Sequence, residues 1–107
     1  MTEPRAGVWI SGSVLTDVIA ERNHQDQKWG RQDHPDGTAR PSDREAAALM
    51  KAKCRLNSPE EDNWRDILEE EVYEVFAESD PAAVRHELIQ VAATAVAWVE
   101  AIDRRTA

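Results

Sequence analysis

Residues 63–80 read NWRDILEEEVYEVFAESD, and residues 81–90 continue directly with PAAVRHELIQ. At about 100° per residue, the apolar side chains of the first stretch fall on one broad arc of a helix. This arc consists of Trp64, Ile67, Leu68, Val72 and Val75. Asp80-Pro81 ends this helix and begins the next, which we expect to continue to about Arg104. Because the link is so short, the two helices are predicted to be antiparallel neighbours.

Glutamates lie on and beside this apolar arc. Glu71 falls inside the arc, and Glu70 and Glu74 follow its edge, whereas Glu69 points away from its centre. A buried carboxylate without a partner is costly, because it loses its hydration and gains nothing in return. We therefore expect Glu71 to face a cation.

The following helix carries a matching polar stripe. Glu87, Gln90 and Thr94 are spaced by three and four residues, so they share one face of a segment that is otherwise apolar from Leu88 to Val99. In an antiparallel hairpin turning near Asp80, Glu87 lies level with Glu74, and Gln90 lies level with Glu70. The polar stripes of the two helices are thus predicted to meet at the same level along the hairpin.

Oxygen ligands favour hard cations, and a site with few protein ligands leaves room for water and phosphate, which suits Mg²⁺ or, as an alternative, Mn²⁺. The sequence therefore predicts a metal site. Its expected ligands are Glu70, Glu71, Glu74, Glu87 and Gln90. The alternative is a solvated acidic face whose charges pair with neighbours four residues away.

The rest of the chain adds two more helices. We interpret residues 1–12 as a loose leader and residues 13–107 as a single helical domain. Ser13 is a suitable N-cap for a first helix that fades between Asp26 and Trp29. Residues 30–41 have loop composition, with two glycines and two prolines among polar residues.

Two capping patterns follow this loop. Ser42 with Glu45 forms a capping box for a second helix. Ser58, with Pro59 and Glu61 after it, repeats the pattern for the third. Four helices with short connections predict an all-α, four-helix antiparallel bundle.

Composition narrows the class of protein. The net charge of −8 argues against binding to a nucleic-acid duplex, and the single Cys54 cannot form an internal disulfide. No window approaches the roughly 20 apolar residues of a membrane span, so we expect a cytoplasmic protein without membrane contact. The fourth helix is apolar on most sides, which a small monomer cannot cover. We therefore expect a homodimer or a higher homo-oligomer.

The run Ile67–Glu74 resembles the E-E-x-x-E motif of the MazG-like, all-α nucleoside triphosphate pyrophosphohydrolases, with Glu70, Glu71 and Glu74 as its acids. The family's second motif, E-x-x-D, maps to Glu87 and Gln90, and here the chain departs from it because Gln90 replaces the usual Asp. Residues 21–37, ERNHQDQKWGRQDHPDG, resemble the leader of a subgroup found in phages and actinobacteria.

The resemblance implies an activity. Divalent metal held by the acids would bridge a triphosphate, and water would attack between the α and β phosphorus atoms, which releases a monophosphate and pyrophosphate. Such an enzyme clears unwanted triphosphates from the nucleotide pool. A glutamate that is not fully engaged as a ligand can deprotonate the water. We assign this role to Glu71, whose apolar setting raises its basicity, or else to Glu70.

Substrate contacts are expected outside the acidic cluster. Trp29 can stack on a base and Lys28 can contact phosphate, or Trp29 can instead plug the end of the first helix. The second helix has a basic side that can either touch phosphates, above all through Lys53, or simply face solvent. It consists of Lys51, Lys53 and Arg55.

Two alternatives to the enzyme stay open. One is a nucleotide-binding or regulatory module that lost catalytic power when the second motif changed at Gln90. The other is a structural interaction domain with an acidic face. Metal binding separates the structural domain from the first two hypotheses, and turnover separates the enzyme from the module.

Overall fold

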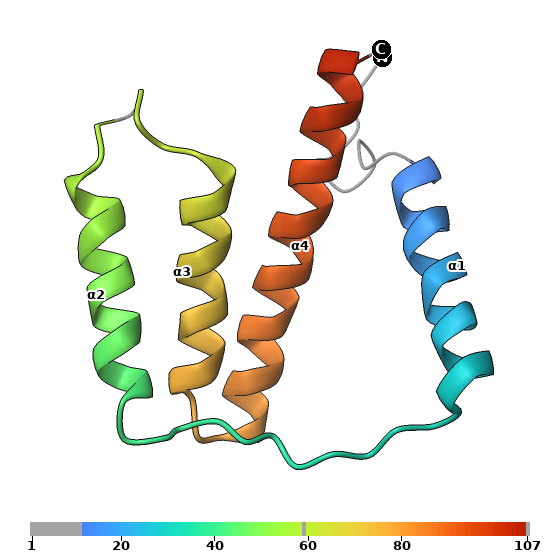
Figure 1. Ribbon diagram of the computed structural model, residues 1–107, viewed down its shortest axis with the longest axis horizontal. Coiled ribbons are helices and arrows are strands. Elements are labelled where there is room, and N and C mark those ends of the chain that lie inside the picture. Colours follow the sequence, from blue (N-terminus) through green and yellow to red (C-terminus); the bar gives the residue numbers. More distant parts are fainter. Residues whose placement is uncertain (1–11, 59, 107) are drawn as a thin grey trace, which may run out of the picture. The chain divides into compact units, whose positions relative to one another are not determined.

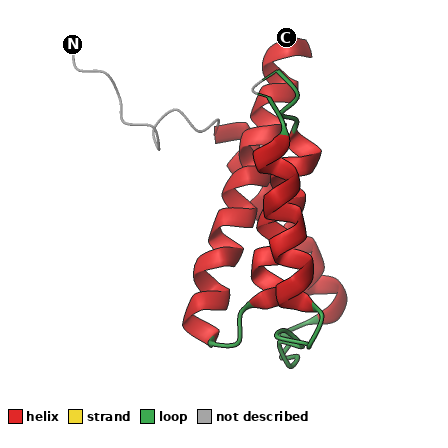
Figure 2. Cartoon of the chain, turned by 90° about the vertical axis from the view of Figure 1, so that its left-hand side faces the viewer, coloured by secondary structure: helices red, strands yellow, loops and turns green. Residues whose placement is uncertain are grey.

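The computed structural model describes residues 12–58 and 60–106. In these ranges it consists of helices, turns and loops, without a strand, as Figures 1 and 2 show. The helices are α1 (Gly12–Trp29), α2 (Asp43–Leu56), α3 (Trp64–Ala77) and α4 (Pro81–Thr106). The predicted all-α class and its four helices are confirmed for this part of the chain. The leader predicted over residues 1–12 lies outside it, except for Gly12.

The chain forms two compact units, which we describe separately. One unit consists of residues 36–95, and the other contains the described residues before 36 and after 95. In the latter unit Val14 of α1 is buried, with 3% of its surface exposed. Helix α1 begins at Gly12, so Ser13 lies inside the helix and does not precede it as the predicted cap. Gly30 ends α1 with φ +67°, a left-handed conformation that glycine adopts without strain, and its N–H donates to Asp26 O at 2.7 Å.

In the unit formed by residues 36–95, α2 packs antiparallel against α3 (Figure 1). Near one end the Cys54 thiol donates to Asp66 O at 3.5 Å. At the other end Ala39 N, in the loop before α2, donates to Phe76 O at 2.7 Å. The latter bond satisfies one of the last carbonyls of α3, which has no partner inside the helix.

The α2 terminus differs from the predicted capping box. Ser42 has φ −85° and ψ −10°, and its side chain makes no capping hydrogen bond. A capping residue needs an extended backbone to turn its oxygen toward the following amides, and Ser42 is already helical. Instead, Asp43 Oδ2 accepts a hydrogen bond from Arg40 N at 2.7 Å. The prediction that Ser42 and Glu45 form a capping box is therefore wrong.

Helix α3 begins later than predicted, at Trp64. Its N-cap is Asn63, whose backbone is extended and whose Oδ1 accepts from Asp66 N at 2.8 Å. Ser58 N donates to Glu61 Oε1 at 2.8 Å, so this pair shapes a turn before the helix and does not start it. Pro59, which was predicted to open the helix, lies outside the described residues.

Helix α4 begins where it was predicted to. Asp80 Oδ2 accepts a hydrogen bond from Ala83 N at 3.1 Å, and Pro81 is the first helical residue. Among the described residues of this unit, Val75 of α3 and Val84 of α4 are the buried ones, at 5% and 6% exposure. The hairpin therefore carries the core of residues 36–95. Within the described ranges, no helix has the length and apolar character needed to cross a membrane.

Candidate metal site

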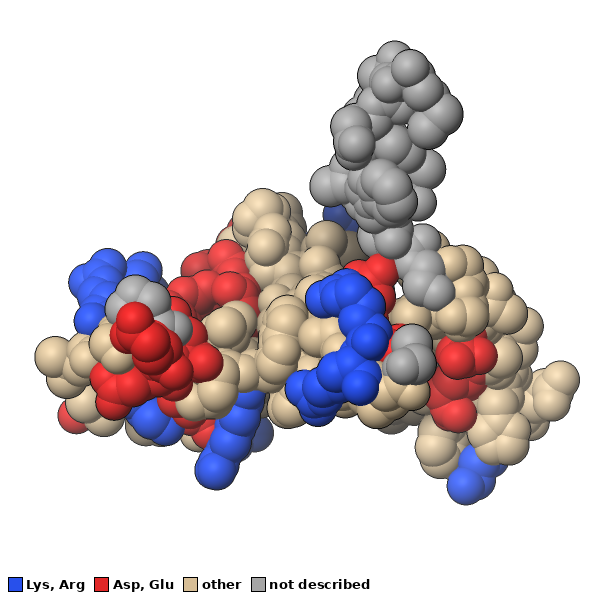
Figure 3. All heavy atoms as spheres, turned by 90° about the horizontal axis from the view of Figure 1, so that it is seen from above, with Lys and Arg blue, Asp and Glu red and all other residues tan. Residues whose placement is uncertain are grey.

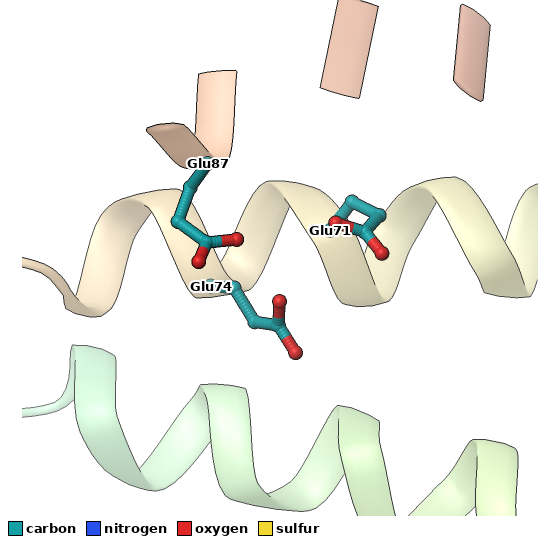
Figure 4. Close-up of side chains that lie close together, drawn as sticks. All are labelled: Glu71, Glu74 and Glu87. Atoms are coloured by element: carbon teal, nitrogen blue, oxygen red, sulfur yellow. The ribbon is translucent and has the colours of Figure 1, made fainter. Parts of the chain in front are cut away.

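Three glutamates converge where α3 and α4 face each other. Glu71 and Glu74 project from α3, and Glu87 reaches them from α4 (Figure 4). Each offers one carboxylate oxygen, and these oxygens all lie within 4.8 Å of one another. All three side chains are half-buried. The predicted meeting of Glu74 with Glu87 across the hairpin is thus observed, and we call Glu71, Glu74 and Glu87 the acidic triad.

Burial and crowding make two members of the acidic triad, Glu71 and Glu74, harder to ionise. Burial raises the pKa of Glu71, and the negative charges of Glu87 and Glu70 raise it further. Burial likewise raises the pKa of Glu74, with additional contributions from the charge of Glu71 and a hydrogen bond with Glu87. A cation among these oxygens would replace repulsion with attraction. The donor set, three carboxylates from two helices, is the chemistry that a hard divalent cation requires.

Basic residues within the described ranges do not neutralise the acidic triad. The ion pairs there involve Arg22 with Asp26, Arg31 with Asp33, and Lys53 with Asp66 and Glu69. Figure 3 shows basic and acidic side chains on the face that it draws. The excess negative charge of the acidic triad is therefore not offset by a neighbouring ion pair.

Glu70 and Gln90, the two other expected ligands, lie outside the acidic triad. Burial, and after it the interaction with Glu70 of α3, raises the pKa of the Cys54 thiol of α2 to about 11. Gln90 is exposed on α4, three residues after Glu87. Their role as ligands stays a prediction.

The acidic triad borders a cleft of about 340 Å³. Glu74, Glu78 and Glu87 line it together with Lys51 of α2, and three alanines complete the walls: Ala47, Ala48 and Ala77. Sequence reasoning gave Lys51 only a secondary place. The signal that could have identified it is the spacing of Lys51 from Ala47 and Ala48, which puts a cation and two small residues on one helical face.

Lys53, the expected phosphate contact, has other partners. Its ammonium lies 3.3 Å from Asp66 Oδ1 and 3.5 Å from Glu69 Oε1. The hydrogen bond with Asp66, together with the charges of Asp66 and Glu69, raises the pKa of Lys53. Glu69 thus faces α2 and lies outside the acidic triad, as predicted.

Trp29 and Lys28 belong to the other unit. Lys28 Nζ lies 4.9 Å from the centre of the Trp29 ring, in a cation–π contact. The Trp29 side chain is 58% exposed, so it does not act as a buried plug at the end of α1. An open hollow of about 430 Å³ lies beside it, lined also by Arg31 and His34. A role of Lys28 and Trp29 in substrate binding stays a prediction.

Comparisons with protein-family models, curated proteins and solved structures find no match to this chain. The resemblance to the MazG-like enzymes therefore stays a prediction from the motif residues. Of these, the acidic triad is the part that the geometry brings together.

Proposed function

We propose that this protein is a Mg²⁺-dependent nucleoside triphosphate pyrophosphohydrolase, with Mn²⁺ as an alternative metal, that removes unwanted nucleotides from the cellular pool. The observation that carries the proposal is the convergence of Glu71, Glu74 and Glu87 on one point from two helices. It is supported by the spacing of these acids, which matches that of the MazG-like motifs, and by the cleft beside them.

In this proposal the acidic triad holds the metal, with Glu70 and Gln90 completing the ligand set. The metal supplies Lewis-acid chemistry, because it neutralises charge on the phosphates and acidifies bound water. Glu71 accepts the proton of the attacking water. A carboxylate beside the metal can take this role where it is not fully engaged as a ligand. Glu70 is the alternative base.

We further propose that the chain works as a MazG-like four-helix bundle in a homodimer or higher homo-oligomer. In the described ranges the buried hydrophobic residues are Val14, Val75 and Val84 alone, while Leu49 and Ile89 expose 61% and 53% of their surface. So small a core cannot offset the conformational entropy lost on folding, and a second copy would bury these apolar faces. Light scattering after size-exclusion chromatography tests this, and a folded monomer at micromolar concentration would contradict it.

The activity is tested by measuring pyrophosphate release from a panel of canonical and modified nucleoside triphosphates, with Mg²⁺, with Mn²⁺ and with neither. We expect metal-dependent turnover that Glu71→Gln lowers by about a hundredfold or more, which is the typical contribution of a general base. Glu69→Gln is the matched control, because it makes the same chemical change on the same helix but outside the acidic triad. Unchanged turnover in Glu71→Gln would overturn the assignment of the base.

The second candidate is a nucleotide-binding or regulatory module, and the observation favouring it is Gln90, since an amide oxygen is a weaker ligand than the carboxylate usual in the family. Metal and nucleotide binding without pyrophosphate release across the panel would support this module. If Mn²⁺ neither binds nor stabilises the protein, a structural interaction domain is the better description.

A further inference from the structure

The cleft beside the acidic triad has walls of opposite charge. Helix α2 contributes Lys51, and the α3–α4 hairpin contributes Glu74, Glu78 and Glu87. Between them the short side chains of Ala47, Ala48 and Ala77 leave the space open. Three glutamates and one lysine thus line a single cleft.

Lys51 is not engaged elsewhere in the described part of the chain. Its side chain is exposed, and the ion pairs found there involve Arg22, Arg31 and Lys53, but not Lys51. Two residues along the same helix, Lys53 is held by Asp66 and Glu69. Of these two lysines, Lys51 is therefore the one whose ammonium can meet a ligand in the cleft.

A ligand that complements both walls must carry positive charge toward the glutamates and negative charge toward Lys51. A divalent metal ion alone complements only the glutamates, and a bare phosphate complements only Lys51. A metal-complexed polyphosphate has both charges at adjacent positions, and lysine is a common phosphate ligand because it acts as a point charge with three donors. We propose that Lys51 binds the phosphate chain of a metal–triphosphate complex in this cleft, an inference that rests on the proposed function.

The test is calorimetric titration of the protein of residues 1–107 with inorganic tripolyphosphate in Mg²⁺, and separately with Mn²⁺ alone. The Lys51→Gln variant should bind tripolyphosphate with an affinity roughly ten- to a hundredfold lower than that of the wild type, because it loses one charge-assisted contact. The affinity for Mn²⁺ should stay equal or become tighter, because a positive charge near the acidic triad is removed. Lys51→Arg should retain most of the tripolyphosphate affinity.

Arg55→Gln is the matched control, because it removes one positive charge from the same helix at a residue that does not line the cleft. It should bind tripolyphosphate like the wild type. Wild-type tripolyphosphate affinity in Lys51→Gln, or a parallel loss of Mn²⁺ affinity, would overturn the role of Lys51. If the wild type binds tripolyphosphate through Lys51 but hydrolyses no nucleotide, the inference stands and the proposed function fails. If it hydrolyses nucleotides and Lys51→Gln has an unchanged KM, only the inference fails.

Discussion

Replacing Glu74 by glutamine should stabilise the metal-free protein at neutral pH. At 4.8 Å, two carboxylates repel by about 0.9 kcal/mol in water and by about 3.5 kcal/mol at an effective dielectric constant of 20. The acidic triad is half-buried, and Glu74→Gln removes two of its three repulsive pairs while the amide can still donate a hydrogen bond to Glu87. Because two such pairs give about 1.8 kcal/mol even at the dielectric constant of water, we expect a gain of about 2 kcal/mol in the free energy of unfolding, or roughly 6–12 °C in Tm for a domain of this size.

The gain should depend on pH in a definite direction. Because the pKa of Glu74 is raised above its usual 4.5, the folded state holds more protons than the unfolded state between these two values. The stability contributed by this carboxyl therefore falls as pH rises through that window. Glu74→Gln does not titrate, so its advantage should be full above the raised pKa and absent below about pH 4, where both states of the wild type are protonated.

Thermal unfolding at pH 4 and pH 7, in the presence of a chelator, measures this difference. At pH 7, Mn²⁺ should make the wild type more stable than Glu74→Gln. An ion at a hundred times its Kd adds about 2.7 kcal/mol to the free energy of unfolding of the wild type and much less to that of the variant. Glu69→Gln should show no stabilisation, because Glu69 already pairs with Lys53. A destabilised Glu74→Gln protein at pH 7, or an equal gain at pH 4, would refute the view that mutual repulsion controls the acidic triad.

Two further predictions concern α3 and α2. Asn63→Ala should lower the free energy of unfolding by about 1 kcal/mol in urea denaturation, because it deletes the N-cap of α3, whereas Ser42→Ala should leave it unchanged because Ser42 caps nothing. Equal losses in both variants would contradict the observed caps. Burial and Glu70 raise the pKa of Cys54 from 9.0 to about 11, so its alkylation by iodoacetamide at pH 8 should be about a hundredfold slower than that of an ordinary cysteine. Rapid labelling of the folded protein would contradict the raised pKa of this thiol.

The sequence allowed the helices to be predicted but not all of their ends. Two capping patterns compete before α3, because an acid follows both Ser58 and Asn63 at the third position. The choice depends on the backbone: Asn63 is extended, and its side chain also donates to Asp66 Oδ2. A tertiary contact favours Asn63 as the cap, since its partner Asp66 also forms an ion pair with Lys53 of α2. The local sequence therefore does not show which of the two residues caps α3.

The candidate site, too, could be predicted from the sequence only in part. The pairing of Glu74 with Glu87 could be predicted because the turn between their helices is short and determines which residues lie level. The positions of Glu70 and Lys51 could not, since both depend on how α2 packs against α3, and the longer α2–α3 connection leaves that register undetermined. As a result, it could not be predicted that Lys53, the expected phosphate contact, pairs with Asp66 and Glu69, whereas Lys51 lines the cleft.

The short link between α3 and α4 also bears on how the protein folds. Glu87 follows Glu71 by only 16 residues, so the acidic triad assembles as soon as one helical hairpin closes. Such local contacts form early, because little loop entropy is lost in making them. The same closure brings three negative charges together, which raises the barrier to docking the hairpin. A divalent ion that binds during this step should therefore accelerate refolding as well as slow unfolding.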